Sequence, residues 1–477
     1  MLKILKNLKN SFWAVVLIII LLIVQAQADL RLPDFTSRIV NVGIQTGGIE
    51  TAAPYIISKE DMENVLMFSE DDDKILENYT LVSESPSKEQ EKILEDYLGK
   101  DYNIEPETLY VINDIDSEQE DELSSIMAGP LMELSTVTNE DTANQIKESF
   151  IANVPERQKE ALENMSLLDI LKSMPEEQRN EVLGEFTGKI DEMQDSIKEQ
   201  AAVTEVSNIY KNIGVDTDKI QNNYILSQGL QMLGIALISM VSAITIMLLS
   251  ARVAAKLGRT LREKVFKKVL SFSTGELNQF STASLITRST NDVQQIQMLI
   301  SILFRVVVYA PIIGIGGFIK VLTNSDSSMA WIIGIAIVGV LFVVATLFIV
   351  AMPKFRKLQE LTDKLNLVSR EILSGLQVIR AFNTEKKEEK RFDGANKDLM
   401  KTNVFVNRAM SIMMPALMLI MNAIMVLIIW VGGHNVDQGV MQVGDMMAFI
   451  QYTMQIVMAF LMISMISIML PRASVSA

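Results

Sequence analysis

Six long apolar stretches constrain this chain more than any other feature of its sequence. A helix needs about 20 such residues to cross the roughly 30 Å of hydrocarbon in a bilayer. Most of the stretches reach that length, and the first and third are marginal. We therefore expect an all-α membrane protein with six transmembrane helices. The stretches are Phe12–Ala28, Ile225–Leu249, Val306–Leu322, Met329–Met352, Met410–Val431 and Met446–Leu470.

Basic residues predict the orientation of these helices. Lysines precede the first stretch, and Lys and Arg are dense between the second and third stretches and between the fourth and fifth. The two opposite connections, Thr323–Ser328 and Gly432–Gly444, contain neither Lys nor Arg. Positively charged loops stay in the cytoplasm. We expect a multi-pass protein of the cell membrane with both termini cytoplasmic and residues 30–224 mostly extracellular.

Acidic residues are concentrated between the first two apolar stretches. Residues 50–220 hold about 42 of the 58 acidic residues but about 14 of the 43 basic residues, which gives that segment a charge near −28. This pattern predicts three parts: residues 1–50 with the first helix, an acidic extracellular insertion at 51–220, and residues 221–477 with helices two to six. We expect the insertion to be mostly helical. Its candidate elements are helices Ser87–Leu98, Ile146–Met165, Leu167–Met174 and Glu176–Gln200, and a strand Tyr110–Ile115.

Two long stretches on the cytoplasmic side, Ala251–Gln295 and Pro353–Asn407, show helical spacing of apolar residues. The membrane helices are therefore expected to continue well into the cytoplasm as two hairpins. We place the ends of these hairpins at the polar segments Ser271–Ser284 and Asp363–Arg370.

We find no catalytic motif in the chain. Gly-Lys occurs at Gly99 and Gly188, without the following Ser or Thr of a phosphate-binding loop. There is no cysteine, and His434 is the single histidine. The acidic series that starts at Asp114 has Gln119 where a calcium-binding EF-hand loop needs glycine. We expect no catalytic residue, metal site or cofactor in this chain.

Four amide side chains lie within or beside the apolar stretches. An amide in lipid must face a partner helix or a cavity, and contact between helices is the interpretation we favour over substrate contact. We expect no Asp or Glu inside any span, whereas secondary transporters place charged or broken helices at the midplane. The candidate cavity residues are Gln231, Asn422, Gln451 and Gln455.

Several runs resemble the membrane domain of bacterial exporter-type ABC transporters, which export drugs, lipids or peptides. Together they cover roughly 290 residues, and the paired hairpin motifs are specific. Ala283 stands where the family usually has glycine, and the insertion is far larger than usual. The runs are Asp29–Val40, Arg262–Leu270, Phe280–Arg288, Asn291–Val293, Arg370–Glu371, Ser374–Gly375, Val378–Phe382 and Ile468–Ser476.

The resemblance implies the transmembrane half of an ATP-driven exporter, with short coupling helices near Ser273–Ser281 and Asp363–Arg370 that dock on nucleotide-binding domains. ATP and Mg²⁺ would bind those domains, which would lie beyond residue 477 or on a partner chain. The other expected partners are a second transmembrane half, identical or different, and membrane lipids, but no nucleic acid. The expected coupling residues are Glu276, Leu277, Phe280, Lys364, Leu365, Leu367 and Arg370.

Alternatives remain at this point. Lysines, a short apolar run and Ala26-Gln27-Ala28 also fit a cleaved signal peptide, which would leave five helices with the same sidedness. We favour an uncleaved first helix because its continuation matches the family. A receptor with an extracellular ligand-binding domain and a secondary transporter are the competing functions. The first would have two helices or a signalling domain, and the second would follow a proton gradient without ATP.

Overall fold

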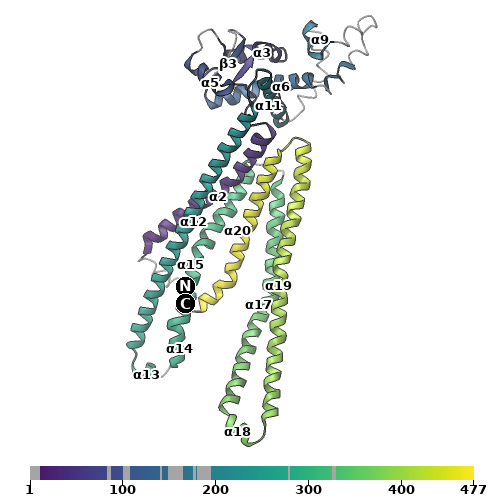
Figure 1. Ribbon diagram of the computed structural model, residues 1–477. Coiled ribbons are helices and arrows are strands. Elements are labelled where there is room, and N and C mark those ends of the chain that lie inside the picture. The colour runs from purple at the N-terminus through teal and green to yellow at the C-terminus, as the bar shows by residue number, and fades with distance from the viewer. Residues whose placement is uncertain are drawn as a thin grey trace. The chain divides into compact units, whose positions relative to one another are not determined.

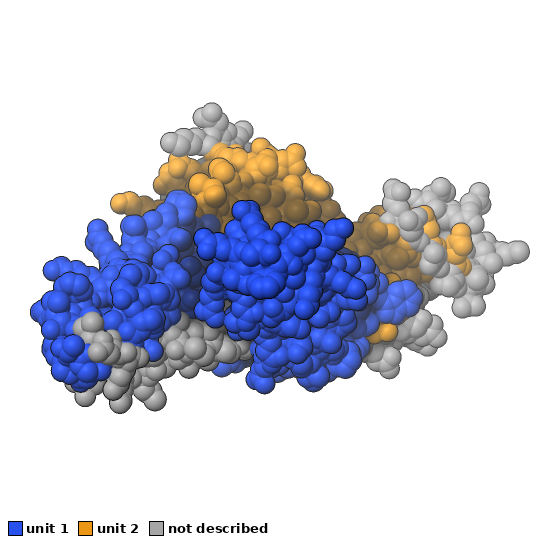
Figure 2. Space-filling view, turned by 90° about the horizontal axis from the view of Figure 1, so that it is seen from below, with its two compact units in different colours: residues 1–31, 236–431, 449–477 blue, residues 32–235, 432–448 orange. Residues whose placement is uncertain are grey.

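The computed structural model describes residues 11–82, 87–99, 108–139, 142–144, 146–148, 165–175, 179, 195–277, 280–324 and 329–476. They form two compact units, which Figure 2 shows in separate colours. Unit 1 comprises residues 1–31, 236–431 and 449–477, and unit 2 comprises residues 32–235 and 432–448.

Among the described residues, six helices are long and apolar enough to cross a membrane. This confirms the predicted number of spans and the all-α membrane class. The helices are much longer than a bilayer requires, because helical periodicity continues through the polar segments. The six segments are Phe12–Gln45, Thr217–Leu270, Thr282–Thr323, Ala330–Ser374, Glu385–Asp437 and Val443–Ile463.

Unit 1 consists of helices, of which α2, α12, α19 and α20 also contribute residues to unit 2. Prolines lie inside α2, α17 and α19 (Pro33, Pro353 and Pro415), as membrane helices tolerate. The elements are α2 (Phe12–Arg38), α12 (Thr217–Leu270), α13 (Thr274–Leu277), α14 (Thr282–Thr287), η3 (Arg288–Asp292), α15 (Val293–Phe304), η4 (Arg305–Tyr309), α16 (Ala310–Asn324), α17 (Ala330–Ser374), α18 (Leu376–Ala381), α19 (Glu385–Asp437) and α20 (Val443–Ser476).

Packing in unit 1 joins helices that are distant in the sequence. Ile18 of α2, Leu257 of α12 and Ile300 of α15 belong to one buried cluster. Glycines bring other helices close: a Cβ added at Gly317 of α16 would lie 2.9 Å from Ile456 Cγ1 of α20. Large apolar side chains remain exposed along these helices, for example Leu237, which is 55% exposed. Outward apolar surface of this kind suits lipid as the surrounding solvent.

The second hairpin differs from the sequence-based expectation. Helix α17 is continuous from Ala330 to Ser374, so Asp363–Arg370 lies inside it and is not a break. The chain turns at Gly375, passes through α18, and turns again at Asn383, whose φ is 52°. Polar composition misled the prediction, because Asp363–Arg370 lacks Gly and Pro and continues an amphipathic helix that buries Leu361 and Val368. Figure 1 shows α18 at the end of this hairpin.

Unit 2 contains a three-stranded antiparallel sheet in the order β1-β3-β2. The predicted strand at Tyr110–Ile115 corresponds to β3, but β1 and β2 were not predicted. Ile56 pairs with Val111, and Tyr79 pairs with Ile112. The elements are η2 (Ile39–Gln45), β1 (Ile56–Ser58), α3 (Lys59–Leu66), α4 (Asp72–Glu77), β2 (Tyr79–Leu81), α5 (Lys88–Leu98), β3 (Leu109–Ile112), α6 (Ser117–Thr138), α9 (Leu167–Ser173) and α11 (Asp195–Asn212).

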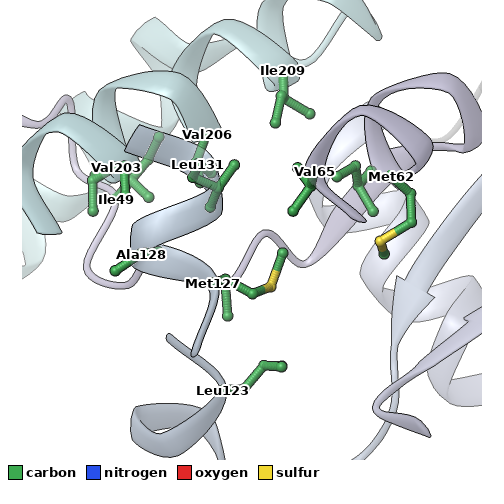
Figure 3. Close-up of a cluster of buried hydrophobic side chains, with 14 of the residues drawn as sticks. Ile49, Met62, Val65, Leu123, Met127, Ala128, Leu131, Val203, Val206 and Ile209 are labelled. Carbon is green, nitrogen blue, oxygen red and sulfur yellow. The ribbon is translucent and has the colours of Figure 1, made fainter. Parts of the chain in front are cut away.

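The core of unit 2 lies where α3, α6 and α11 meet. Met127 and Leu131 of α6 pack with Val206 of α11 and Val65 of α3, and all four side chains are fully buried. Figure 3 shows these side chains directed toward one another. Burial of a side chain of this size contributes about 1.5–3 kcal/mol. The insertion therefore has its own hydrophobic core, which it needs because the chain lacks disulfides.

Helix caps explain where several insertion helices begin. Ser87 and Gln90 form a capping box at α5, and Asp116 and Gln119 form another at α6. The predicted helices at Ser87–Leu98 and Leu167–Met174 are confirmed as α5 and α9. Those at Ile146–Met165 and Glu176–Gln200 fall largely outside the described residues. Asp116, which the sequence raised as part of a failed calcium loop, serves as a cap.

The two ends of the insertion are adjacent. The side-chain nitrogen of Gln221 donates a hydrogen bond of 2.8 Å to the Gly43 carbonyl oxygen, and the Tyr224 hydroxyl lies 3.0 Å from a Glu50 carboxylate oxygen. Gly48 adopts a positive φ of 84°, and a Cβ there would lie 2.9 Å from Gln221 Cα. The chain therefore enters and leaves the insertion at the same point.

Candidate functional site

The end of the first long hairpin, between the second and third membrane-crossing segments, is the short helix α13, which begins in the predicted segment Ser273–Ser281. The Ser273 backbone N–H donates to Glu276 Oε2 at 2.8 Å, and the Glu276 N–H donates to Ser273 Oγ at 3.4 Å. The hydrogen bond from the Ser273 backbone holds the pKa of the Glu276 carboxyl below its ordinary value, and the Ser273 hydroxyl adds to this. Glu276 therefore serves first to cap the helix that carries Leu277.

Phe280 stacks on a partner that the sequence did not reveal. Its ring lies 5.7 Å from that of Phe272, with 11° between the planes. Arg288 sits over the Phe280 ring, and Lys268 over the Phe272 ring. This stack closes the hairpin end and flanks it with two cations. Ala283 lies in the first turn of α14, where alanine favours a helix more than glycine does.

The end of the second hairpin carries exposed apolar side chains around α18. Leu373, Val378 and Phe382 are 74%, 60% and 75% exposed. Arg391 of α19 bridges back to Glu371 of α17 at 2.6 Å, which fixes the two helices beside the turn. These apolar residues, rather than those predicted from the sequence, form the end surface. These residues are identified by their exposure in the structure. The sequence shows only that they are apolar, and their helical spacing does not tell whether they are buried or exposed.

The residues predicted for the second coupling segment lie within α17, before its end at Ser374. Lys364, Leu367 and Arg370 are exposed, and Leu365 is half-buried. Asp363–Arg370 is therefore not a separate short helix, and the coupling role of these residues stays a prediction. The short helix is α18, after the Gly375 turn.

A carboxylate lies among the membrane helices of unit 1. Asp29 accepts a hydrogen bond of 2.5 Å from the Ser239 hydroxyl of α12 and another of 2.5 Å from the Tyr309 hydroxyl of η4. Both donors lie in apolar stretches, so the sequence-based statement that no acid falls inside a span is wrong. The apolar run ends at Ala28, but helix α2 continues to Arg38.

The four predicted amide residues are not brought together. Gln455 of α20 donates to the Asp29 backbone carbonyl oxygen at 3.1 Å, and the neighbouring Tyr452 donates to that of Leu30. Gln455 is thus a contact between helices, the interpretation favoured above. Gln451 is half-buried one turn away, and Asn422 is exposed on α19. Gln231 is exposed and belongs to unit 2.

A second polar network lies within unit 2, between the end of α2 and the start of α20. The Ser37 hydroxyl donates to Asp445 Oδ1 at 2.6 Å, and the Asn41 side-chain nitrogen donates to the same oxygen at 3.1 Å. The Gly444 N–H donates to Asn41 Oδ1 at 2.6 Å. A Cβ at Gly444 would collide with both Asn41 and the Ser37 carbonyl oxygen. Only glycine permits this approach.

Six membrane-crossing helices with two long polar hairpins define the chain as a multi-pass helical membrane domain. The chain belongs to the ABC transporter transmembrane region family, whose family model matches residues 206–460. It is therefore a transmembrane component of an ABC transporter. The resemblance inferred from the hairpin motifs is confirmed, and nothing in these findings favours a receptor or a secondary transporter.

Curated relatives agree with this assignment. The chain is 38% identical over 255 residues to an uncharacterized ABC transporter ATP-binding protein of Mycobacterium tuberculosis. The aligned region covers 53% of this chain and 43% of the relative. It is 32% identical over 248 residues to the uncharacterized ABC transporter ATP-binding protein YfiB of Bacillus subtilis, covering 52% and 43% respectively. The chain thus spans less than half the length of these relatives.

Proposed function

We propose that this chain is the transmembrane half of an ATP-driven exporter. It would work with a second transmembrane half and with nucleotide-binding domains that carry ATP and Mg²⁺. The observation that supports this proposal best is the pair of long helical hairpins, each ending in a short helix, α13 or α18. The relatives are named as ATP-binding proteins and extend beyond the region shared with this chain.

The hairpin ends are the proposed docking surfaces. Phe272 and Phe280 stack at the first end, and Leu373, Val378 and Phe382 expose apolar surface at the second. Apolar side chains outside a membrane favour burial against a protein partner. Closure of the nucleotide-binding domains would move these ends, and the continuous helices α12, α17 and α19 would carry that movement toward the membrane.

Chemical cross-linking tests the docking. The chain contains no cysteine. A photoreactive maleimide added to Ser273→Cys or Val378→Cys therefore attaches to this chain at that one position, and any cross-link starts there. In native membranes we expect both variants to cross-link to a polypeptide, or a segment of the same polypeptide, that also labels with an azido-ATP analogue. Leu230→Cys, an exposed position on α12, is the matched control. The proposal fails when neither end gives an ATP-labelled product.

The proposed orientation places the insertion outside the cell and the hairpins inside. Thr80→Cys lies on an exposed strand position of the insertion, and Ser273→Cys lies at the first hairpin end. A membrane-impermeant maleimide applied to intact cells should label the first variant and spare the second until the cells are opened. The reverse pattern would invert the topology and exclude docking of cytoplasmic ATPase domains at the hairpin ends.

A further inference from the structure

A cavity of about 400 Å³ lies within unit 1, where the first turn of α2 meets α12. Its volume falls in the range of small-molecule sites, roughly 300–1,000 Å³. The residues that α12 contributes are Leu249, Arg252, Val253 and Lys256. Their spacing of three or four positions places them on one face of the helix. This face therefore brings two basic side chains to the cavity.

Packing of α2 on α12 gives the cavity its walls. Val253 is 3% exposed and belongs to the same buried cluster as Ile18 of α2. Ala14 and Leu249, which line the cavity, pack against that cluster. Apolar side chains thus hold the two helices together directly beside the cavity, whereas the two basic residues are exposed.

The lining of the cavity is positively charged. None of the described residues that line it is acidic, and Arg252 and Lys256 are both basic. Along α12, the first acidic residue after Lys256 is Glu263, and Lys267 pairs with it at 2.6 Å. A concave surface lined by charge of one sign concentrates ions of the opposite sign. The cavity therefore favours an anion.

The cavity lies at a boundary of the membrane. The first apolar stretch begins at Phe12 and the second ends at Leu249, and both residues line the cavity. Trp13, which also lines it, is 81% exposed, and tryptophan is enriched at the level of the lipid headgroups. Within the apolar stretches, Leu17 and Leu248 are 45% and 58% exposed. Basic side chains at headgroup level thus adjoin apolar surface that suits acyl chains.

We propose that this cavity binds an anionic phospholipid, with its phosphate between Arg252 and Lys256 and its acyl chains along the exposed apolar surface of α2 and α12. Basic pockets between membrane helices suit acidic headgroups, and a guanidinium group can hold a phosphate through two parallel hydrogen bonds. A soluble phosphate would use the cations but not the apolar surface. Residues 1–10 contain three lysines and no Asp or Glu, so like charge disfavours that segment as the occupant.

Fluorescence of Trp13 tests the proposal at the cavity itself. The chain has three tryptophans, so Trp331→Phe with Trp430→Phe leaves Trp13 as the single emitter. This parent, as the full chain, is placed in phosphatidylcholine bilayers with brominated phosphatidylcholine or brominated phosphatidylglycerol at equal mole fraction. Bromine quenches tryptophan at contact, so the ratio of the two quenching curves gives the relative association constant of the two lipids. We expect phosphatidylglycerol to associate about fivefold or more tightly, since each basic side chain contributes up to about fivefold.

Removal of both charges should abolish the preference. In Arg252→Gln with Lys256→Gln, the ratio should fall close to one, while quenching by phosphatidylcholine stays at the parent value because α2 remains in place. Arg252→Lys with Lys256→Arg keeps both charges and should keep the ratio. Arg259→Gln is the matched control, because Arg259 is an exposed basic residue of the same helix that does not line the cavity. It should retain the preference of the parent.

Four results would overturn the site. Equal quenching of the parent by the two lipids would remove it. A preference that survives without both charges, or falls as far in Arg259→Gln, would assign the effect to the general charge of α12. Loss of the preference when the charges are exchanged would exclude charge as its cause. Loss in excess inorganic phosphate at constant ionic strength would make the occupant a free anion. The assay needs no nucleotide, so this inference does not depend on export.

Discussion

The side-chain nitrogen of Gln455 donates a hydrogen bond of 3.1 Å to the backbone carbonyl oxygen of Asp29, 426 positions away. The same Asp29 accepts hydrogen bonds through its side chain from Ser239 and Tyr309. One turn of α2 thus contacts α12, η4 and α20. Among helices in lipid, where burial of apolar surface does not drive association, such contacts specify which helices pack together.

Loss of the Asp29 side chain should destabilise unit 1. Asp29→Leu leaves the Ser239 and Tyr309 hydroxyls without their acceptor, at a cost of about 1–3 kcal/mol. Gln455→Leu, which removes one hydrogen bond between helices, should cost less, about 0.6 kcal/mol. Unfolding in SDS measures both. Leu248→Ala, at a position 58% exposed, serves as control. Equal stability of Asp29→Leu and the parent would show that the network contributes nothing.

The cap at the first hairpin end should depend on Glu276. Glu276→Gln should increase hydrogen exchange at residues 273–277 at pH 7, because the charged carboxylate is the better acceptor for the Ser273 N–H. The pKa of Glu276 is lowered, so the cap is complete above the ordinary value and is lost as pH falls through the lowered one. Parent and variant should therefore converge in strongly acidic buffer. A difference that persists there would assign the effect to shape alone.

Coupling should depend on α18 rather than on the middle of α17. In the assembled transporter, Phe382→Ala should reduce substrate-stimulated ATP hydrolysis several-fold, because it removes exposed apolar surface from the proposed docking end. Leu367 is 44% exposed within α17. Leu367→Ala should therefore change the free energy of unfolding by no more than about 0.5 kcal/mol, and its rate of ATP hydrolysis should stay near that of the parent. The reverse order would restore the segment at Asp363–Arg370 as the coupling element.

Tyr210 should be important for the stability of the insertion. Its hydroxyl accepts a 2.8 Å hydrogen bond from the Tyr55 backbone N–H, and its side chain is 1% exposed. Tyr210→Phe leaves this N–H without an acceptor, which costs about 1–3 kcal/mol. Thermal unfolding followed by tyrosine circular dichroism measures the loss. Tyr110→Phe, at a half-buried strand position, should unfold close to the parent temperature.

The insertion should become less stable as pH rises, because Glu205 loses its proton. Its pKa is raised above the ordinary value of 4.5, so the folded state binds its proton more tightly than the unfolded chain. This contribution is full below about pH 4.5 and is lost as pH rises through the raised value. Burial is the main cause of the raised pKa of Glu205, the charge of Asp61 adds to it, and hydrogen bonds from Asn208 and Thr138 oppose it. Glu60 and Lys172 form an ion pair beside the polar cavity of unit 2 that Glu205 lines. Glu205→Gln should therefore unfold at higher temperature than the parent at pH 7.5, but not at pH 4.5. A gain of equal size at both pH values would contradict this cause.

Apolar periodicity accounts for the parts of the fold that the sequence predicted. Six spans and the helical extensions beyond them follow from residues such as Leu257 and Leu361 at helical spacing. Ser87 also marks the start of α5 correctly, because a capping box is a local signal. These features depend on neighbours in the sequence, so the sequence contains enough information to predict them.

Long-range contacts explain the failures. Strands β1 and β2 have three residues each, too few for a period-two pattern, and they exist because β3 pairs with both. Asp29 ended an apolar run in the sequence, but Ser239 and Tyr309 satisfy its carboxylate inside the bundle. Asp61 and Glu205 stand 144 positions apart, and they line one polar cavity of unit 2 because α3 and α11 both pack on α6.

The meeting of Gly43 and Gln221 at the base of the insertion gives the chain a modular construction. A segment whose two ends touch replaces a short loop without spreading the helices that carry it, so it can be gained, lost or exchanged as a cassette. The same geometry ties the two connections of the insertion to each other: the hydrogen bond between Gln221 and Gly43 holds the start of α12 beside η2, so that neither connection can shift without the other.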